Sequence, residues 1–128
     1  MSSTLVFLSL LLWLSFVNSC DITATLTSQS YYPVYAQFTF HDGRRSAVLY
    51  FPQYGSVQTT RITGTFCSSR PTRLDAYRTY PGYASWPYAS SQAFIEGYGF
   101  VSYSILSDGV FMGAKAGVLC AAGDCGRG

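Results

Sequence analysis

The fold class is decided by residues 34–51, VYAQFTFHDGRRSAVLYF. Apolar side chains occupy every second position of its first half: Val34, Ala36, Phe38 and Phe40. A period of two is typical of a β-strand with one buried face. Asp42-Gly43 then predicts a tight hairpin turn, and residues 46–51 supply the return strand. Pro52 ends that strand because proline has no amide hydrogen to donate.

The same period recurs on both sides of this hairpin. Further strands are expected at residues 22–27, 59–67, 73–80, 93–106 and 110–120. Within residues 93–106, Gly97 and Gly99 predict a bulge or bend, and Asp108-Gly109 predicts a second hairpin. No segment has a helical period, so we expect an all-β fold, an antiparallel β-sandwich of about seven strands, with a small β-barrel as the alternative.

The N-terminal segment predicts export. Residues 5–17 are apolar apart from two serines, and the small residue Ser19 follows. This pattern is typical of a signal peptide, so we expect residues 1–19 to be removed and residues 20–128 to form a single secreted domain without a membrane span. A bacterial lipobox at residues 17–20 is the alternative, although lipidation of Cys20 would leave an odd number of cysteines.

All four cysteines, Cys20, Cys67, Cys120 and Cys125, lie in the expected mature domain. An even number in a short exported chain predicts two disulfides, for which three connectivities exist. We favour Cys20–Cys125 and Cys67–Cys120, because the first pair joins the two ends of the domain and the second joins the ends of two long strands. A zinc site usually needs close cysteine pairs, so neither a metal nor another cofactor is expected.

Charge and chemistry exclude several functions. A net charge of +2 does not indicate a nucleic-acid partner. His41 is the sole histidine, and in a predicted turn we expect it to be solvated. The sequence contains no GxSxG motif and no phosphate-binding loop. We therefore expect a protein that is not an enzyme.

The segment between residues 73 and 88 is the candidate binding region, because Tyr, Trp and Arg dominate binding hot spots. The residues concerned are Arg73, Tyr77, Arg78, Tyr80, Tyr83, Trp86 and Tyr88. They could stack on a sugar or anchor a protein partner. Alternatively, Trp86 and its neighbours could fold inward and plug one end of the sandwich.

Residues at the two ends of the expected domain, together with the middle cysteine, resemble those of a known group of proteins. Cys20-Asp21-Ile22, the single middle cysteine Cys67 and the ending Val118-Leu119-Cys120 through Cys125 are similar to small secreted nematode proteins of unassigned function. The resemblance implies secretion and disulfide pairing.

Together these observations predict a secreted, non-enzymatic β-sandwich that binds a protein or a glycan through loops rich in Tyr, Trp and Arg. One alternative is a structural or host-defence protein of an extracellular layer. The other is a small hydrolase that depends on His41.

Overall fold

The protein is described by a computed structural model over residues 19–82 and 85–126, so the expected signal peptide before Ser19 lies outside the described residues. The strands are β1 (Ser19–Gln29), β2 (Val34–Thr39), β3 (Leu49–Phe51), β4 (Val57–Thr65), β5 (Thr72–Tyr77), β6 (Ala89–Leu106) and β7 (Val110–Gly123). This confirms the all-β prediction. Over the described ranges, no helix is long and apolar enough to cross a membrane.

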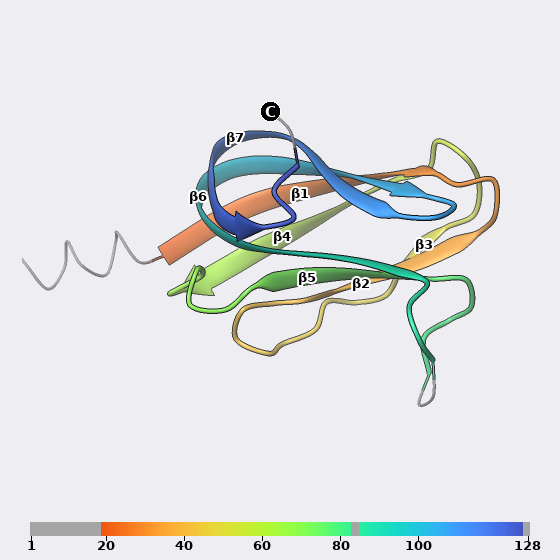
Figure 1. The fold of residues 1–128 in the computed structure, drawn as a ribbon, viewed down its shortest axis with the longest axis horizontal. Helices are drawn as coiled ribbons and strands as arrows, with labels where there is room; N and C mark the ends of the chain where they lie inside the picture. The colour runs from red at the N-terminus through yellow and green to blue at the C-terminus, as the bar shows by residue number, and fades with distance from the viewer. Residues whose placement is uncertain (1–18, 83–84, 127–128) are drawn as a thin grey trace, which may run out of the picture.

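The strands form one sheet that folds over itself into two layers (Figure 1). The order is β3-β2-β5-β6-β1-β4, and β7 pairs with β6. The first part of β6 pairs with β5, whereas its second part pairs with β1. Strand β6 therefore belongs to both layers, and the curled sheet nearly closes into a barrel.

Strand β6 changes layer at the predicted glycine bulge. The register between β6 and β7 shifts between Gly97 and Phe100. Across from the shift, Gly117 has a φ of +71°, and a Cβ there would lie 2.0 Å from the carbonyl oxygen of Tyr98. The backbones approach each other so closely because glycine has no side chain.

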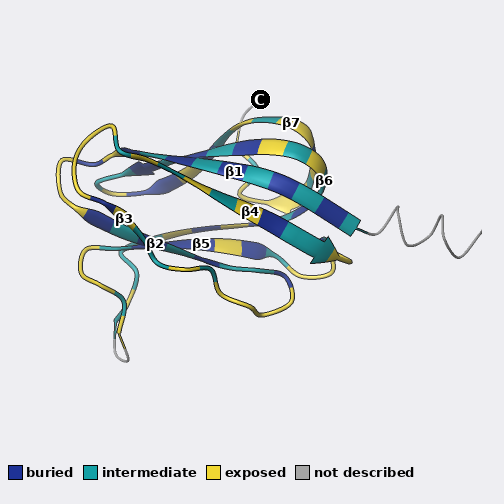
Figure 2. Cartoon of the chain, turned by 180° about the vertical axis from the view of Figure 1, so that it is seen from behind, coloured by how far each residue is buried: buried dark blue, intermediate teal, exposed yellow. Residues whose placement is uncertain are grey.

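The core lies between the two layers, as the dark blue bands on the strands show (Figure 2). The alternating residues of β1 (Ile22, Ala24, Leu26) and of β2 (Val34, Ala36, Phe38) are fully buried. Phe38 of one layer meets Tyr103 of the other edge to face, with ring centroids 5.5 Å apart. This alternation is the pattern predicted from the sequence.

Three details differ from the sequence-based picture. Strand β1 runs parallel to β6, with Asp21 opposite Tyr98, while its pairing with β4 is antiparallel. The return strand of the first hairpin is short, because residues 46–48 leave the ladder after an isolated bridge between Thr39 and Arg45. Phe66 falls within the strand expected at residues 59–67, but it follows β4 and is exposed.

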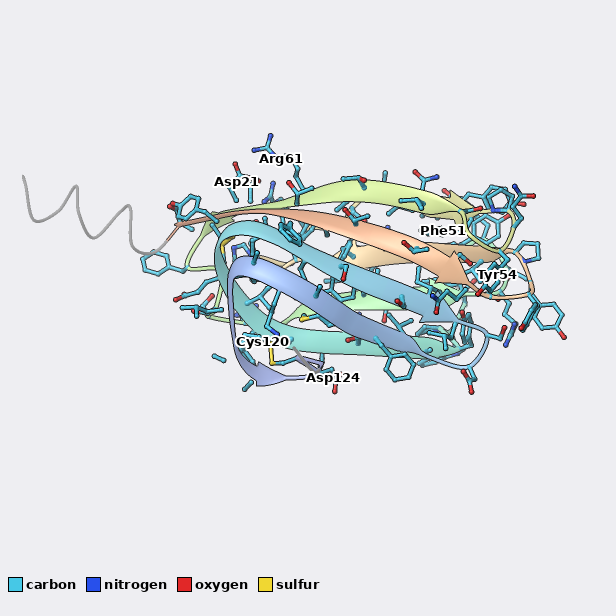
Figure 3. The ribbon with its side chains drawn as sticks, turned by 90° about the horizontal axis from the view of Figure 1, so that it is seen from above. Asp21, Phe51, Tyr54, Arg61, Cys120 and Asp124 are labelled. Carbon is cyan, nitrogen blue, oxygen red and sulfur yellow. A yellow bond between two sulfur atoms is a disulfide. The ribbon has the colours of Figure 1, made fainter. Side chains whose placement is uncertain are left out.

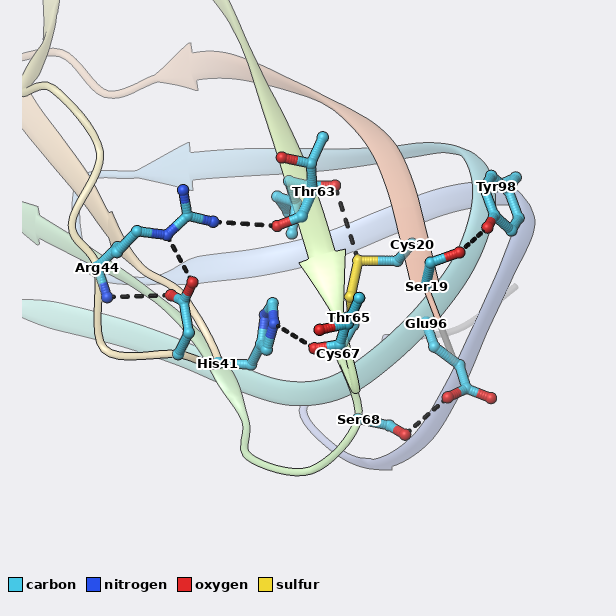
Figure 4. Close-up of a disulfide and its surroundings, with 12 residues drawn as sticks. Ser19, Cys20, His41, Arg44, Thr63, Thr65, Cys67, Ser68, Glu96 and Tyr98 are labelled. Atoms are coloured by element: carbon cyan, nitrogen blue, oxygen red, sulfur yellow. Dashed lines mark hydrogen bonds and ion pairs between the residues drawn. A yellow bond between two sulfur atoms is a disulfide. The ribbon is translucent and has the colours of Figure 1, made fainter. Parts of the chain in front are cut away.

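The disulfide connectivity that we favoured is wrong. The bridges are Cys20–Cys67 and Cys120–Cys125. Cys20 pairs in the β1–β4 ladder with Gly64, so the turn after β4 brings Cys67 to it (Figure 4). The tail after β7 folds back over only five positions to join Cys125 to Cys120. Two disulfides are the state expected of a protein from an oxidising compartment.

The first hairpin turn supports a pH-dependent prediction. Asp42 accepts hydrogen bonds from the backbone N of Arg44 at 3.1 Å and from its Nε at 2.5 Å. Desolvation by itself raises the pKa of Asp42, but the hydrogen bonds and charge of Arg44 outweigh it and hold the pKa below its usual value. A carboxyl whose pKa is lower in the folded state than in the unfolded state stabilises the fold at pH values above its unfolded pKa. This stabilisation is lost as the pH falls through the folded pKa.

We therefore expect Asp42→Asn to lower the free energy of unfolding at neutral pH by about 0.5 kcal/mol, a small amount because both side chains are largely solvated. The difference from wild type should shrink as the pH falls below the unfolded aspartate pKa of about 3.9 and through the lower folded pKa. Chemical denaturation at neutral pH and in strong acid measures it. The control is Asp108→Asn in the second hairpin turn, which should change little at either pH. An equal deficit for Asp42→Asn at both pH values would contradict this account.

Candidate functional site

A groove with a volume of about 640 Å³ lies on the outer face of β2, β5 and β6. Its floor comes from alternate residues of the strands, whose neighbours in sequence point into the core. One wall is the loop between β5 and β6, which projects from the body of the sheet (Figure 1). The described lining residues are Gln37, Arg45, Val48, Arg73, Asp75, Tyr77, Tyr80, Pro81, Gly82, Ser85, Trp86, Pro87 and Ser90.

Asp75 is the centre of the floor. The strand pairing places it between Gln37 of β2 and Ser90 of β6. Its side chain is only 6% exposed. One carboxylate oxygen accepts a hydrogen bond from Ser90 Oγ at 2.5 Å, and the other accepts one from Arg73 Nε at 3.1 Å. These partners compensate for the loss of hydration, so the carboxylate is held in a fixed position.

Aromatic side chains line the groove on the loop side. Trp86 is 88% exposed and Tyr80 is 66% exposed. Behind them, the Tyr35 ring stacks on Tyr50 at 4.8 Å and meets Tyr80 edge to face at 5.6 Å. Tyr35 in turn lies opposite Tyr77 in the β2–β5 ladder. The groove therefore joins a polar floor to an aromatic rim.

The electrostatics of the groove centre on Tyr77. Desolvation raises the pKa of its hydroxyl, and the Asp75 carboxylate raises it further, whereas Arg45 and Arg73 oppose the shift. The hydroxyl is therefore neutral at physiological pH and can donate a hydrogen bond. Two guanidinium groups and one carboxylate line the groove, which leaves it with a positive charge.

The structure divides the predicted binding residues into two groups. Arg73, Tyr77, Tyr80 and Trp86 line the groove. Arg78 and Tyr88 instead lie at the base of the loop, where the Arg78 guanidinium stacks 4.5 Å from the Tyr88 ring and donates to the carbonyl oxygen of Ser107. They anchor the loop to the β6–β7 hairpin. Tyr83 lies outside the described residues.

The alternative in which Trp86 plugs the sandwich is wrong, because this side chain projects into solvent. Tyr88 comes closest to that role: it packs against the core, and its hydroxyl donates to the carbonyl oxygen of Leu106 at 2.7 Å.

His41 was expected to be solvated, but the structure buries it. Its ring is 4% exposed and lies over Gly64, where a Cβ would come within 2.9 Å of it. His41 Nε2 is 3.0 Å from the carbonyl oxygen of Thr65, and Nδ1 has no hydrogen-bond partner among the described residues (Figure 4). The ring packs the hairpin against β4, and no nucleophile or carboxylate of the described chain hydrogen-bonds to it.

Sequence reasoning missed several polar lining residues, among them Gln37, Arg45, Asp75 and Ser90, and it missed Tyr35, whose ring packs on Tyr80. A signal for two of them was present, since Tyr35 and Gln37 occupy the polar face of the alternating segment 34–40. In the described part of the chain, no cluster of three His, Cys, Asp or Glu side chains could hold a metal ion.

The chain matches no protein-family model, and no curated protein is significantly similar to it. One solved structure that it resembles is titled "Trapped Toxin", with a TM-score of 0.34 and 13% sequence identity. The match covers 73% of this chain, which spans only 23% of the length of that one. A TM-score this low identifies neither a shared fold nor a shared function.

Proposed function

We propose that this protein is a secreted, non-enzymatic binding domain that holds a glycan in the outer groove of β2, β5 and β6. The observation that carries the proposal is the fixed Asp75 carboxylate in a groove that the exposed rings of Tyr80 and Trp86 also line. Export is supported by the apolar segment 5–17 and by the two disulfides.

The two parts of the groove suit the two kinds of surface on a sugar. The hydroxyl groups of a sugar need directional hydrogen bonds, which Asp75, Gln37 and Ser90 can make from fixed backbone positions. The apolar C–H face of a sugar ring can lie on the electron-rich face of Trp86 or Tyr80. A small set of placed polar groups beside aromatic surface is typical of a ligand site.

A protein partner fits the groove less well. A stable protein interface buries about 800 Å² on each side and has few charged residues at its centre. Here the floor carries the charged Arg73 guanidinium, which is 46% exposed and which a protein surface would have to desolvate.

Hydrolysis of a bound glycan is not part of the proposal. Glycoside hydrolases use a pair of carboxyl groups on either side of the scissile bond. Among the described lining residues, Asp75 is the single carboxylate, so such a pair is missing from the described groove.

The test is a glycan array followed by titration of the best ligand. We expect Trp86→Ala to weaken binding about tenfold, since a lost aromatic contact costs roughly 1.4 kcal/mol. The melting temperature should stay within a few degrees of wild type, because the side chain is solvated. The matched control is Tyr54→Ala, which removes an exposed ring from the loop after β3 (Figure 3) and is not among the lining residues of the groove.

Two results would overturn the proposal. One is unchanged glycan binding by both Trp86→Ala and Asp75→Asn. The other is a folded wild-type protein that binds no glycan on the array and instead captures a protein partner in a Trp86-dependent manner.

A further inference from the structure

The charged side chains around the groove are not all neutralised within the chain. Arg61 pairs with Asp21 on the face of β1 and β4 (Figure 3), and Arg44 pairs with Asp42 in the hairpin. Arg73 pairs with Asp75 on the groove floor. For Arg45, no carboxylate lies within ion-pair distance among the described residues.

Arg45 has a defined place at the groove. Its backbone forms the bridge with Thr39 of β2, which fixes where the side chain begins. The next residue is also held, because Ser46 Oγ accepts a hydrogen bond from the backbone N of Phe38 at 3.0 Å. Arg45 lines the groove on the side of β2. Its charge opposes the rise in the pKa of the Tyr77 hydroxyl.

The adjacent residue, Arg44, points away from the groove, whereas Arg45 faces it. Arg44 donates from its terminal nitrogen to the carbonyl oxygen of Thr63 on β4 at 3.2 Å (Figure 4). Two successive arginines therefore serve different surfaces: Arg44 ties the hairpin to β4, and Arg45 faces the ligand site.

We infer that the ligand in this groove is an acidic glycan, whose carboxylate or sulfate group binds the Arg45 guanidinium while its hydroxyl groups bind the floor around Asp75. This inference rests on the proposed function and names the class of its ligand. The planar guanidinium presents paired N–H donors that match the two oxygens of a carboxylate or sulfate.

The Asp75 carboxylate does not prevent an anion from binding nearby. Its charge is balanced by Arg73, and its side chain is almost completely buried. Arg45 supplies the additional positive charge, at the edge of the groove where solvent reaches it. The acidic group and the hydroxyl groups of one ligand therefore have separate places.

The experiment compares ligands and variants in one series of titrations. The ligands are a neutral oligosaccharide, its carboxylated counterpart, its sulfated counterpart and inorganic sulfate alone. The proteins are wild type, Arg45→Gln, and the control Arg70→Gln, which removes the same charge from the exposed turn between β4 and β5. Titrations at low and high salt add a second readout, since a charge-assisted contact weakens with ionic strength.

We expect wild type to bind one or both acidic glycans about tenfold more tightly than the neutral one, and to bind inorganic sulfate far more weakly. Arg45→Gln should remove the preference for the acidic glycan, because it should weaken binding of the acidic glycan far more than binding of the neutral one. Arg70→Gln should keep the preference.

Three outcomes would overturn the inference. Equal affinity of wild type for neutral and acidic glycans would refute it while leaving the proposed glycan site intact. A preference retained by Arg45→Gln, or inorganic sulfate binding as tightly as the glycans, would also refute it. Failure of every glycan to bind would reject the proposed function together with the inference.

Discussion

A chain with Cys20→Ala and Cys67→Ala is expected to lose about 4 kcal/mol of its free energy of unfolding. The bridge closes a sequence separation of 47, so it strongly restricts the unfolded chain. Both cysteines are also buried in the core, and alanine leaves part of their space empty. A loss of this size is a large share of the stability of a small domain.

The second bridge provides the control. Cys120–Cys125 spans a separation of only five residues, so the double variant Cys120→Ala, Cys125→Ala should lose about 2 kcal/mol. Guanidinium unfolding of wild type and both double variants measures the difference. Equal losses from the two bridges would show that loop length does not govern their contributions.

Substitution of Gly117 by alanine is expected to have a comparable effect on stability, of about 3 kcal/mol or more. Its φ of +71° disfavours any residue with a Cβ, and the new Cβ would lie 2.0 Å from the carbonyl oxygen of Tyr98. The new Cβ would clash with a backbone atom, which cannot rotate away as a side chain can. Strands β6 and β7 would therefore have to move apart at the point where β6 changes layer.

The variant Gly43→Ala separates the cost of a positive φ from the cost of the clash with the Tyr98 carbonyl oxygen. Gly43 has a similar φ of +87°, but a Cβ there meets nothing within 4 Å. We expect this variant to lose about 1 kcal/mol, the cost of the backbone conformation alone. Thermal and chemical unfolding of both variants tests the comparison. If Gly117→Ala lost no more than Gly43→Ala, the close contact at the bulge would have no energetic role.

The local features of the fold could be predicted from the sequence. The alternation of Ile22, Ala24 and Leu26 is produced by burial of one strand face, and adjacent residues are enough to reveal it. The turn at Asp42-Gly43 depends on a residue that tolerates a positive φ, which is +87° at Gly43. This turn and the one at Asp108-Gly109 both occur where they were predicted.

The features that depend on pairing between distant strands could not be predicted in the same way. The partner of Cys20 is determined by the ladder between β1 and β4, and no local pattern reports which strands will be neighbours. Asp75 is buried because Ser90 and Arg73 cover it, and Ser90 becomes its neighbour only when β6 pairs with β5. The candidate site was therefore only partly visible in the sequence: its aromatic rim is one continuous segment, whereas its floor is assembled from three strands.

The parallel pairing of β1 with β6 has a consequence for how the chain folds. Strand β1 is synthesised before the other described strands, yet Asp21 pairs with Tyr98 of β6. Contacts between residues so distant in sequence slow folding, because a long loop must close before they form. Strand β1 therefore stays unpaired on this side until the ribosome has made β6. A chaperone that shields β1 during synthesis and export would act at the step where this protein is most exposed to aggregation.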